Sequence, residues 1–122
     1  MSDGRDLTAY WAGLRRQYDE DRAAMERERL ELLEKVRSAG DALRALGAKE
    51  VILFGSILRP GHFDRASDID MLIVGLPEDF TWKALKAVED ATGIWDRSLN
   101  LVFDDMAPES LVEEARKTGM PL

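Results

Sequence analysis

A helix-forming pattern runs through the first third of the chain and sets the main constraint on its fold. Residues 5–46 are rich in Arg, Glu, Leu and Ala and contain no proline. Apolar or small residues recur there at steps of mostly three or four, which predicts one face of an α-helix. These residues are Leu7, Trp11, Leu14, Tyr18, Met25, Leu32, Val36, Ala39, Leu43 and Leu46. Arg22 and Arg29 interrupt this face. Gly40 predicts a kink or break near residues 38–41, because glycine costs a helix about 1 kcal/mol relative to alanine.

This predicted helix is too long to be buried entirely by the chain that carries it. With 122 residues the chain has room for one domain with a modest core. The first half of the helix, with Trp11, Leu14 and Tyr18, therefore needs a further surface to pack on. We expect one of three: its own domain, a second copy of the chain, or a partner protein. The chain divides into a helical segment, residues 1–46, whose first part is an interaction arm, and a folded domain, residues 47–122.

The pattern changes in the middle of the chain. Short apolar runs at residues 51–54, 69–74 and 99–103 predict strands, and a glycine ends the first two. Residues 80–92 carry apolar side chains at helical spacing, and Pro108 opens a final helix. The order helix, strand, strand, helix, strand, helix predicts a small α/β (α+β) domain.

Composition excludes several classes of function. Cysteine is absent, which rules out disulfides, thiolate zinc sites and cysteine nucleophiles. The net charge of -7 repels phosphate backbones, so we expect no binding to long nucleic acid. No apolar run approaches the length of about 20 residues that spans a bilayer, and no secretory signal follows Met1. We therefore expect no membrane association and a cytoplasmic location.

Asp68 and Asp70 stand two residues apart on a predicted strand, so both carboxylates lie on one face. Two such charges about 4 Å apart repel each other by a few kcal/mol, and a cation between them removes this cost. Oxygen ligands in a site shared with phosphates favour Mg²⁺ or Mn²⁺. An Asp-x-Asp pair alone is more often a solvated strand end, so the metal site depends on a second motif.

Gly55 and Ser56 form that second motif, at the end of a predicted buried strand. Glycine lets the backbone turn tightly and approach a phosphate closely, and the serine hydroxyl adds a donor. Backbone amides at the start of a following short helix would point outward and bind an anion. Arg59 and Arg65 lie between the two motifs and are candidates for contacting phosphate. The sequence therefore predicts a phosphate-binding turn that faces a metal-binding pair.

Taken together, the motifs resemble the minimal nucleotidyltransferases of the DNA polymerase beta superfamily. The resemblance is carried by Phe-Gly-Ser at 54–56, Arg59, Ser-Asp-Ile-Asp-Met-Leu-Ile-Val at 67–74 and Leu-Asn-Leu-Val at 99–102. It covers about residues 30–118. It implies a mixed sheet of three or four strands packed by helices, with a two-metal site for a nucleoside triphosphate.

The resemblance also implies roles for residues and partners. Gly55 and Ser56 would hold the triphosphate, and Asp68 and Asp70 would hold the metal. In such a site a hydroxyl attacks the metal-bound triphosphate and pyrophosphate leaves. Many relatives are encoded beside a HEPN-domain partner, and they resemble antitoxins that transfer adenylyl groups from ATP to the HEPN toxin.

The chain departs from the family pattern at the third metal ligand, where the resemblance calls for a carboxylate and the chain has Asn100. Asparagine offers one neutral carbonyl oxygen and cannot act as a general base. Three interpretations are open. In the first, Asn100 is natural and the protein transfers slowly or not at all. In the second, Asn100 was introduced to trap a complex. In the third, Asp96 or Asp104 takes the role of the third carboxylate. Residues 57–67 are also one residue longer than the usual spacing, an addition that the loop at Pro60 absorbs.

We therefore expect a nucleotidyltransferase that binds metal-ATP and transfers an adenylyl group to a hydroxyl of a partner protein. The expected biological setting is the antitoxin of a HEPN toxin–antitoxin pair. The alternative is a catalytically silent module that neutralises or scaffolds a partner by contact through the N-terminal helix. Binding of magnesium-ATP would distinguish the two.

Overall fold

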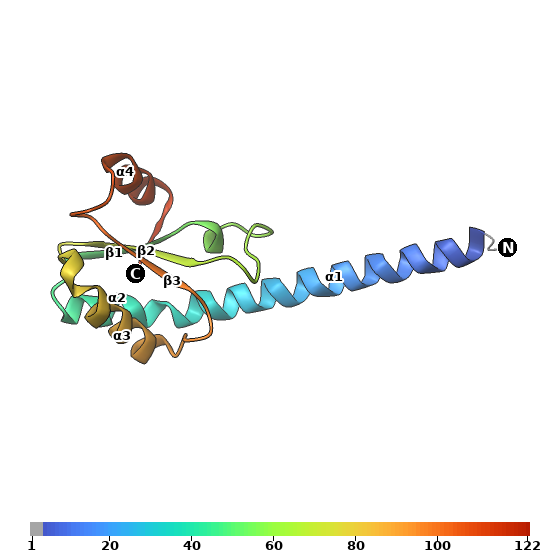
Figure 1. The fold of residues 1–122 in the computed structure, drawn as a ribbon, viewed down its shortest axis with the longest axis horizontal. Helices are drawn as coiled ribbons and strands as arrows, with labels where there is room; N and C mark the ends of the chain where they lie inside the picture. Colours follow the sequence, from blue (N-terminus) through green and yellow to red (C-terminus); the bar gives the residue numbers. More distant parts are fainter. Residues whose placement is uncertain (1–3) are drawn as a thin grey trace.

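The computed structural model describes residues 4–122, so residues 1–3 of the predicted helical segment lie outside the described part. Two helices, α1 (Gly4–Lys35) and α2 (Arg37–Ala45), follow each other with an interruption at Val36 (Figure 1). The break predicted near residues 38–41 is therefore misplaced. Gly40 lies inside α2, where a β-carbon would come within 2.6 Å of the backbone carbonyl carbon of Leu122. Close packing of the C-terminus, rather than a helix break, accounts for this glycine.

Four strands form one mixed sheet, in agreement with the three or four strands that the family resemblance implies. They are β1 (Glu50–Phe54), β2 (Ile69–Val74), β3 (Leu99–Phe103) and β4 (Met120–Pro121), in the spatial order β3-β2-β1-β4. The β1–β2 and β1–β4 pairs are antiparallel, and the β2–β3 pair is parallel. The sequence predicts the first three strands within one residue, but a two-residue strand such as β4 leaves no periodic signal.

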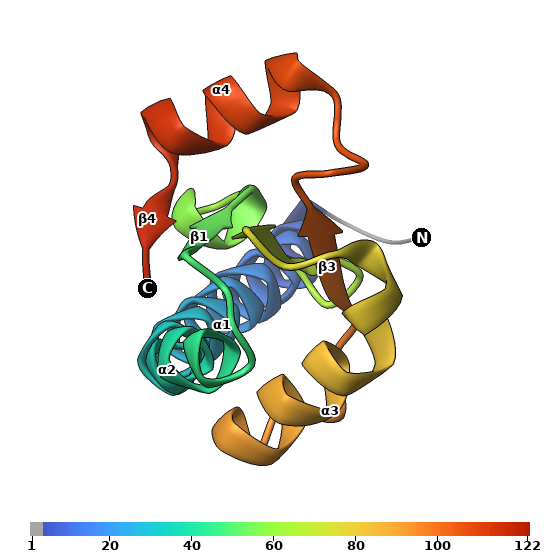
Figure 2. The ribbon, with the colours of Figure 1, turned by 90° about the vertical axis from the view of Figure 1, so that its left-hand side faces the viewer.

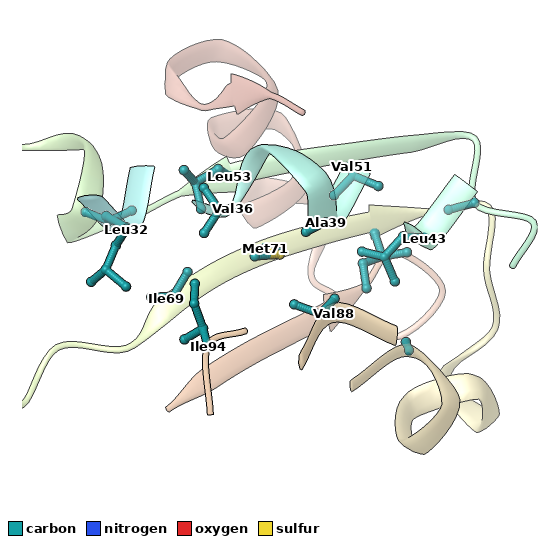
Figure 3. Close-up of a cluster of buried hydrophobic side chains, with 14 of the residues drawn as sticks. Leu32, Val36, Ala39, Leu43, Val51, Leu53, Ile69, Met71, Val88 and Ile94 are labelled. Carbon is teal, nitrogen blue, oxygen red and sulfur yellow. The ribbon is translucent and has the colours of Figure 1, made fainter. Parts of the chain in front are cut away.

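The larger core lies on the face of the sheet that α2, α3 (Thr81–Thr92) and the end of α1 cover (Figure 2). Alternate residues of β1 and β2 point to this face because side chains alternate along a strand. Figure 3 shows them packed against the helices. The main contributors are Leu32, Val36, Ala39, Leu43, Val51, Leu53, Ile69, Met71, Ile73, Ala84 and Val88.

The opposite face carries a smaller cluster under α4 (Glu109–Thr118) (Figure 2). Ile52, Leu72, Val74 and Ala115 are buried in this cluster. The intervening residues of β2 therefore point toward the α4 side. Asp70 is one of them, so the predicted site lies on the more lightly covered face of the sheet.

The first two-thirds of α1 project away from the domain as a straight arm (Figure 1). Every residue from 7 to 24 is exposed, so the arm does not fold back onto its own domain. Its exposed large apolar residues are Leu7, Tyr10, Trp11, Leu14 and Tyr18. Within residues 4–122, no helix has the length and apolar character needed to cross a membrane.

Candidate functional site

Gly55 and Asp70 lie against each other where β1 ends. Strand register pairs Asp70 with Phe54, the residue before Gly55. Gly55 has a φ of 88°, a region that side-chain-bearing residues rarely adopt. A β-carbon at Gly55 would also overlap Oδ2 of Asp70. Both the backbone conformation and the neighbouring carboxylate therefore require glycine at this position.

Asn100 is the second neighbour of Asp70. The parallel β2–β3 register pairs the two residues, and Nδ2 of Asn100 donates a hydrogen bond of 2.9 Å to Oδ1 of Asp70. Partial burial raises the pKa of the Asp70 carboxyl above its ordinary value. The Asn100 hydrogen bond opposes that rise, and the nearby Asp68 charge adds to it. The site therefore holds a carboxylate whose negative charge is only partly compensated.

Asp68 completes the acidic pair from the chain just before β2. Its side chain is exposed, whereas Ile69 beside it is fully buried on the opposite face. This alternation places Asp68 on the same side of the sheet as Asp70. The structure thus brings together four of the predicted residues, Gly55, Asp68, Asp70 and Asn100.

The donor set fits an oxygen-preferring divalent cation that takes its remaining ligands from phosphate and water. Asp68 and Asp70 supply carboxylates, and Asn100 supplies an amide next to them. Gly55 leaves room beside Oδ2 of Asp70 that any side chain would fill. Within residues 4–122, no group of three or more His, Cys, Asp or Glu side chains is placed to bind a metal. The pair accordingly depends on further ligands from outside the protein.

Neither of the two acids considered as replacements for Asn100 reaches Asp70. A carboxylate oxygen of Asp104 accepts a hydrogen bond of 3.1 Å from the backbone amide of Gly75, at the far end of β2. Asp96 lines a groove along α1 with Arg27 and other charged residues. The contacts of Asp96 and Asp104 therefore lend no support to the interpretation in which one of them takes the role of Asn100.

A groove between the glycine turn and α4 opens directly beside Gly55. Its volume is about 470 Å³, and Phe54, Gly55, Arg59 and Leu111 are among the residues that line it. Ser56 begins a single turn of 3₁₀-helix, Ser56–Leu58, which is the short helix expected there. The groove gives Arg59 access to a group bound at the turn.

Arg65 has a different position from Arg59. It is exposed and lines a separate groove between α1 and residues 60–66. The structure therefore does not join Arg65 to the groove beside Gly55, and of the two arginines only Arg59 shares that groove.

Arg29 is a buried residue that positions the turn beginning at Ser56, and the sequence gives only an indirect indication of this role. Its Nη1 donates a hydrogen bond of 2.8 Å to the backbone carbonyl of Ile57, inside the turn that begins at Ser56. Glu26 accepts two further hydrogen bonds from the same guanidinium. The position of Arg29 on the apolar face of the predicted helix is the sequence feature that indicates this role, because a buried charge needs specific partners.

Arg97 holds the second loop of the site, and no sequence pattern singled it out. Its side chain is only 6% exposed, and Nη1 donates to the carbonyl oxygens of Asp64 and Ser67. Its Nη2 pairs with Glu28 of α1 at 3.0 Å, and its guanidinium lies over the Phe63 ring. The loop that leads to Asp68 is therefore fixed to α1 through one arginine.

Comparison with known proteins agrees with this geometry. A family model described as "Nucleotidyltransferase domain" matches residues 29–116, which is most of the chain and includes both motifs. A search of the curated proteins found no match. The match supports a general nucleotidyl transfer function for the domain, and such domains use nucleoside triphosphates with divalent metal. On this match and on its fold, the chain belongs to the nucleotidyltransferase domain family of the polymerase-beta-like superfamily.

Proposed function

We propose that the chain binds a metal–nucleoside triphosphate complex at Gly55, Ser56, Asp68 and Asp70 and transfers a nucleotidyl group to a hydroxyl of a partner protein. The observation that carries the proposal is the contact between Gly55 and Asp70. It sets a turn suited to phosphate directly against a carboxylate suited to metal. Magnesium is the expected cation, manganese is its substitute, and ATP is the expected nucleotide.

The roles of the side chains follow from their chemistry. Asp68 and Asp70 would hold the divalent cation, which when bound supplies positive charge to the triphosphate. The hydroxyl of Ser56 can donate to a phosphate oxygen, and Arg59 lines the groove that opens beside Gly55. Arg29 and Arg97 act through other residues, because they fix the two loops rather than contact the ligand.

The transfer step replaces a phosphoanhydride bond of the triphosphate with a phosphate ester bond to the acceptor. The acceptor oxygen forms a bond to the α-phosphorus, the bond from that phosphorus to the bridging oxygen breaks, and pyrophosphate leaves. The acceptor proton passes to solvent, because the neutral amide of Asn100 cannot take it. We therefore assign this chain a slow transfer rate and expect an acid at position 100 to raise it.

The acceptor in this proposal is a HEPN-domain protein, and the basis for that choice is the resemblance of the two motifs to antitoxin nucleotidyltransferases. Mass spectrometry of such a partner after incubation with the chain, ATP and magnesium provides the test. The expected result is a mass increase of one nucleotidyl unit, faster with Asn100→Asp and lost with Asp68→Ala. A partner whose mass stays constant with both the unmodified chain and Asn100→Asp, while it is still inhibited, would instead indicate action by contact alone.

A further inference from the structure

The exposed apolar face of the arm is a direct continuation of the buried face of α1. Leu7, Trp11, Leu14 and Tyr18 follow the same helical spacing as Met25, which is partly buried against the core, and Leu32, which is buried in it. Steps of three and four residues keep side chains on one face of a helix. The face that packs in the domain thus runs on, uncovered, for about three further turns. Trp11 and Tyr18 are 63% and 62% exposed there, although large aromatic residues are usually well buried.

A groove opens beside this face where the arm leaves the domain. It lies between α1 and residues 60–66, has a volume of about 930 Å³, and is lined by Tyr18, Arg22, Met25 and Phe63 among others. Its lining on α1 runs from Tyr18 to Glu26, which is about 12 Å at 1.5 Å per residue, or about two turns of helix.

The chain itself supplies a segment that fits. The groove spans residues 18–26 of α1. If a second α1 lies antiparallel with its Tyr18 against Tyr18, its residues 10–18 come level with that span. Trp11 of the second copy is then level with Met25, and the second copy's Tyr10 and Leu14 lie within the same span. Each copy provides both the groove and the residues that fill it, which is the self-complementarity that a twofold interface requires.

Charge along the arm favours the antiparallel arrangement over the parallel one. Arg15 and Arg16 precede Tyr18, and Asp19, Glu20 and Asp21 follow it. About a twofold axis at position 18, residue 15 is level with 21 and residue 16 with 20, so opposite charges meet. A parallel pair would place the two arginines level with the same arginines of the second copy, and the acidic residues level with acidic residues. Like charges at such distances repel.

From these relationships we propose that two copies of the chain form an antiparallel dimer through α1, each inserting residues 10–18 of its arm into the groove beside the other's residues 60–66. This inference does not depend on the proposed nucleotidyl transfer, because it uses none of the residues assigned to metal or triphosphate. The proposal places a second copy of the chain, and not a different protein, on the exposed apolar face of the arm.

Analytical ultracentrifugation of the full chain tests the assembly. A dimer of the 13.8 kDa chain is expected, and Trp11→Glu should weaken dimerisation by about 30-fold or more, because a central interface tryptophan commonly contributes that much. Trp82→Glu is the matched control, since Trp82 is equally large and 79% exposed but lies on α3, away from the arm. A monomer at all concentrations, or a dimer that Trp11→Glu leaves unchanged, would overturn the proposal.

Disulfide trapping tests the orientation, and the absence of cysteine makes single introduced thiols unambiguous. Tyr18→Cys should form a covalent dimer on oxidation, because position 18 meets its own copy at the axis. Trp11→Cys alone should stay monomeric on a denaturing gel and should cross-link only when combined with Met25→Cys. Efficient self-linking of Trp11→Cys would show a parallel pair and contradict the proposed arrangement.

Discussion

The side-chain amide of Asn100 donates a hydrogen bond of 2.9 Å to Oδ1 of Asp70 across the parallel pair of strands β2 and β3. This bond replaces part of the charge compensation that a metal ion would give, and it opposes the effect of burial on the pKa of Asp70. Asn100 thereby stabilises the site when no metal is bound, at the position where the family pattern has a third carboxylate.

Replacing Asn100 with aspartate should therefore have opposite effects with and without metal. In the presence of a chelator, Asn100→Asp should lower the free energy of unfolding by about 2 kcal/mol, since it removes a hydrogen bond and adds a like charge beside Asp70. Added magnesium should reverse that loss, and thermal melts with and without the metal measure both. Asn100→Ala removes only the hydrogen bond, so its melting temperature should not respond to magnesium more than that of the unmodified chain. An Asn100→Asp chain that is equally stable in chelator and in magnesium would contradict this account.

Gly55 allows a second prediction with a well-matched control. Gly55→Ala should destabilise the protein by about 3 kcal/mol, because alanine both strains the left-handed backbone and collides with the carboxylate of Asp70. Gly93 also has a positive φ, 71°, but a β-carbon there would meet no atom within 4 Å. Gly93→Ala should therefore cost only about 1 kcal/mol. Urea denaturation of the two variants measures the difference, and equal losses would mean that the Asp70 contact is not tight.

The sequence was sufficient to predict what depends on local pattern. The runs at 51–54, 69–74 and 99–103 predicted their strands because each is a short, mainly apolar segment. Local pattern also predicts the two motifs that contain Gly55 and Asp70. The contact between these two residues depends on the β1–β2 register, which local pattern does not give.

Features that depend on contacts between distant segments could not be predicted in this way. The sequence predicts a break at Gly40, but the interruption lies at Val36, and the absent side chain of Gly40 instead makes room for Leu122. No local pattern marks Arg97, because its partners, Glu28 and the loop 64–67, are distant in sequence and join it only in the fold. Likewise, only the fold could show that Arg59 and Arg65 line different grooves.

Arg29 should contribute much more to stability than a surface arginine in a similar helical pair. Arg29→Met leaves the carbonyl of Ile57 without its donor in a buried setting, so we expect a loss of about 2 kcal/mol in the free energy of unfolding. Arg37 forms the corresponding pair with Glu34 three residues earlier, but that pair is largely exposed. Arg37→Met should cost no more than about 0.5 kcal/mol. Chemical denaturation that shows similar small losses for both variants would exclude Arg29 as a support of the turn.

Arg97 should affect ligand binding as well as stability. Arg97→Met removes the donors that hold the carbonyls of Asp64 and Ser67, so the position of Asp68 becomes less well defined. We expect the affinity for magnesium-ATP to fall about tenfold, a loss of about 1.4 kcal/mol. Arg116→Met, which breaks a half-exposed pair with Glu50, is the control and should leave the affinity unchanged. A folded Arg97→Met chain with full affinity would remove Arg97 from the list of positioning residues.

The central claim is that Gly55 and the carboxylates of Asp68 and Asp70 form one metal–triphosphate site, and calorimetric titration with ATP tests it most directly. With magnesium present, the chain should bind one equivalent of ATP. Chelation of the metal should weaken this binding at least tenfold, and Asp70→Ala should abolish it without unfolding the protein. Failure of the unmodified chain to bind magnesium-ATP, or binding that persists in chelator and in Asp70→Ala, would contradict the account.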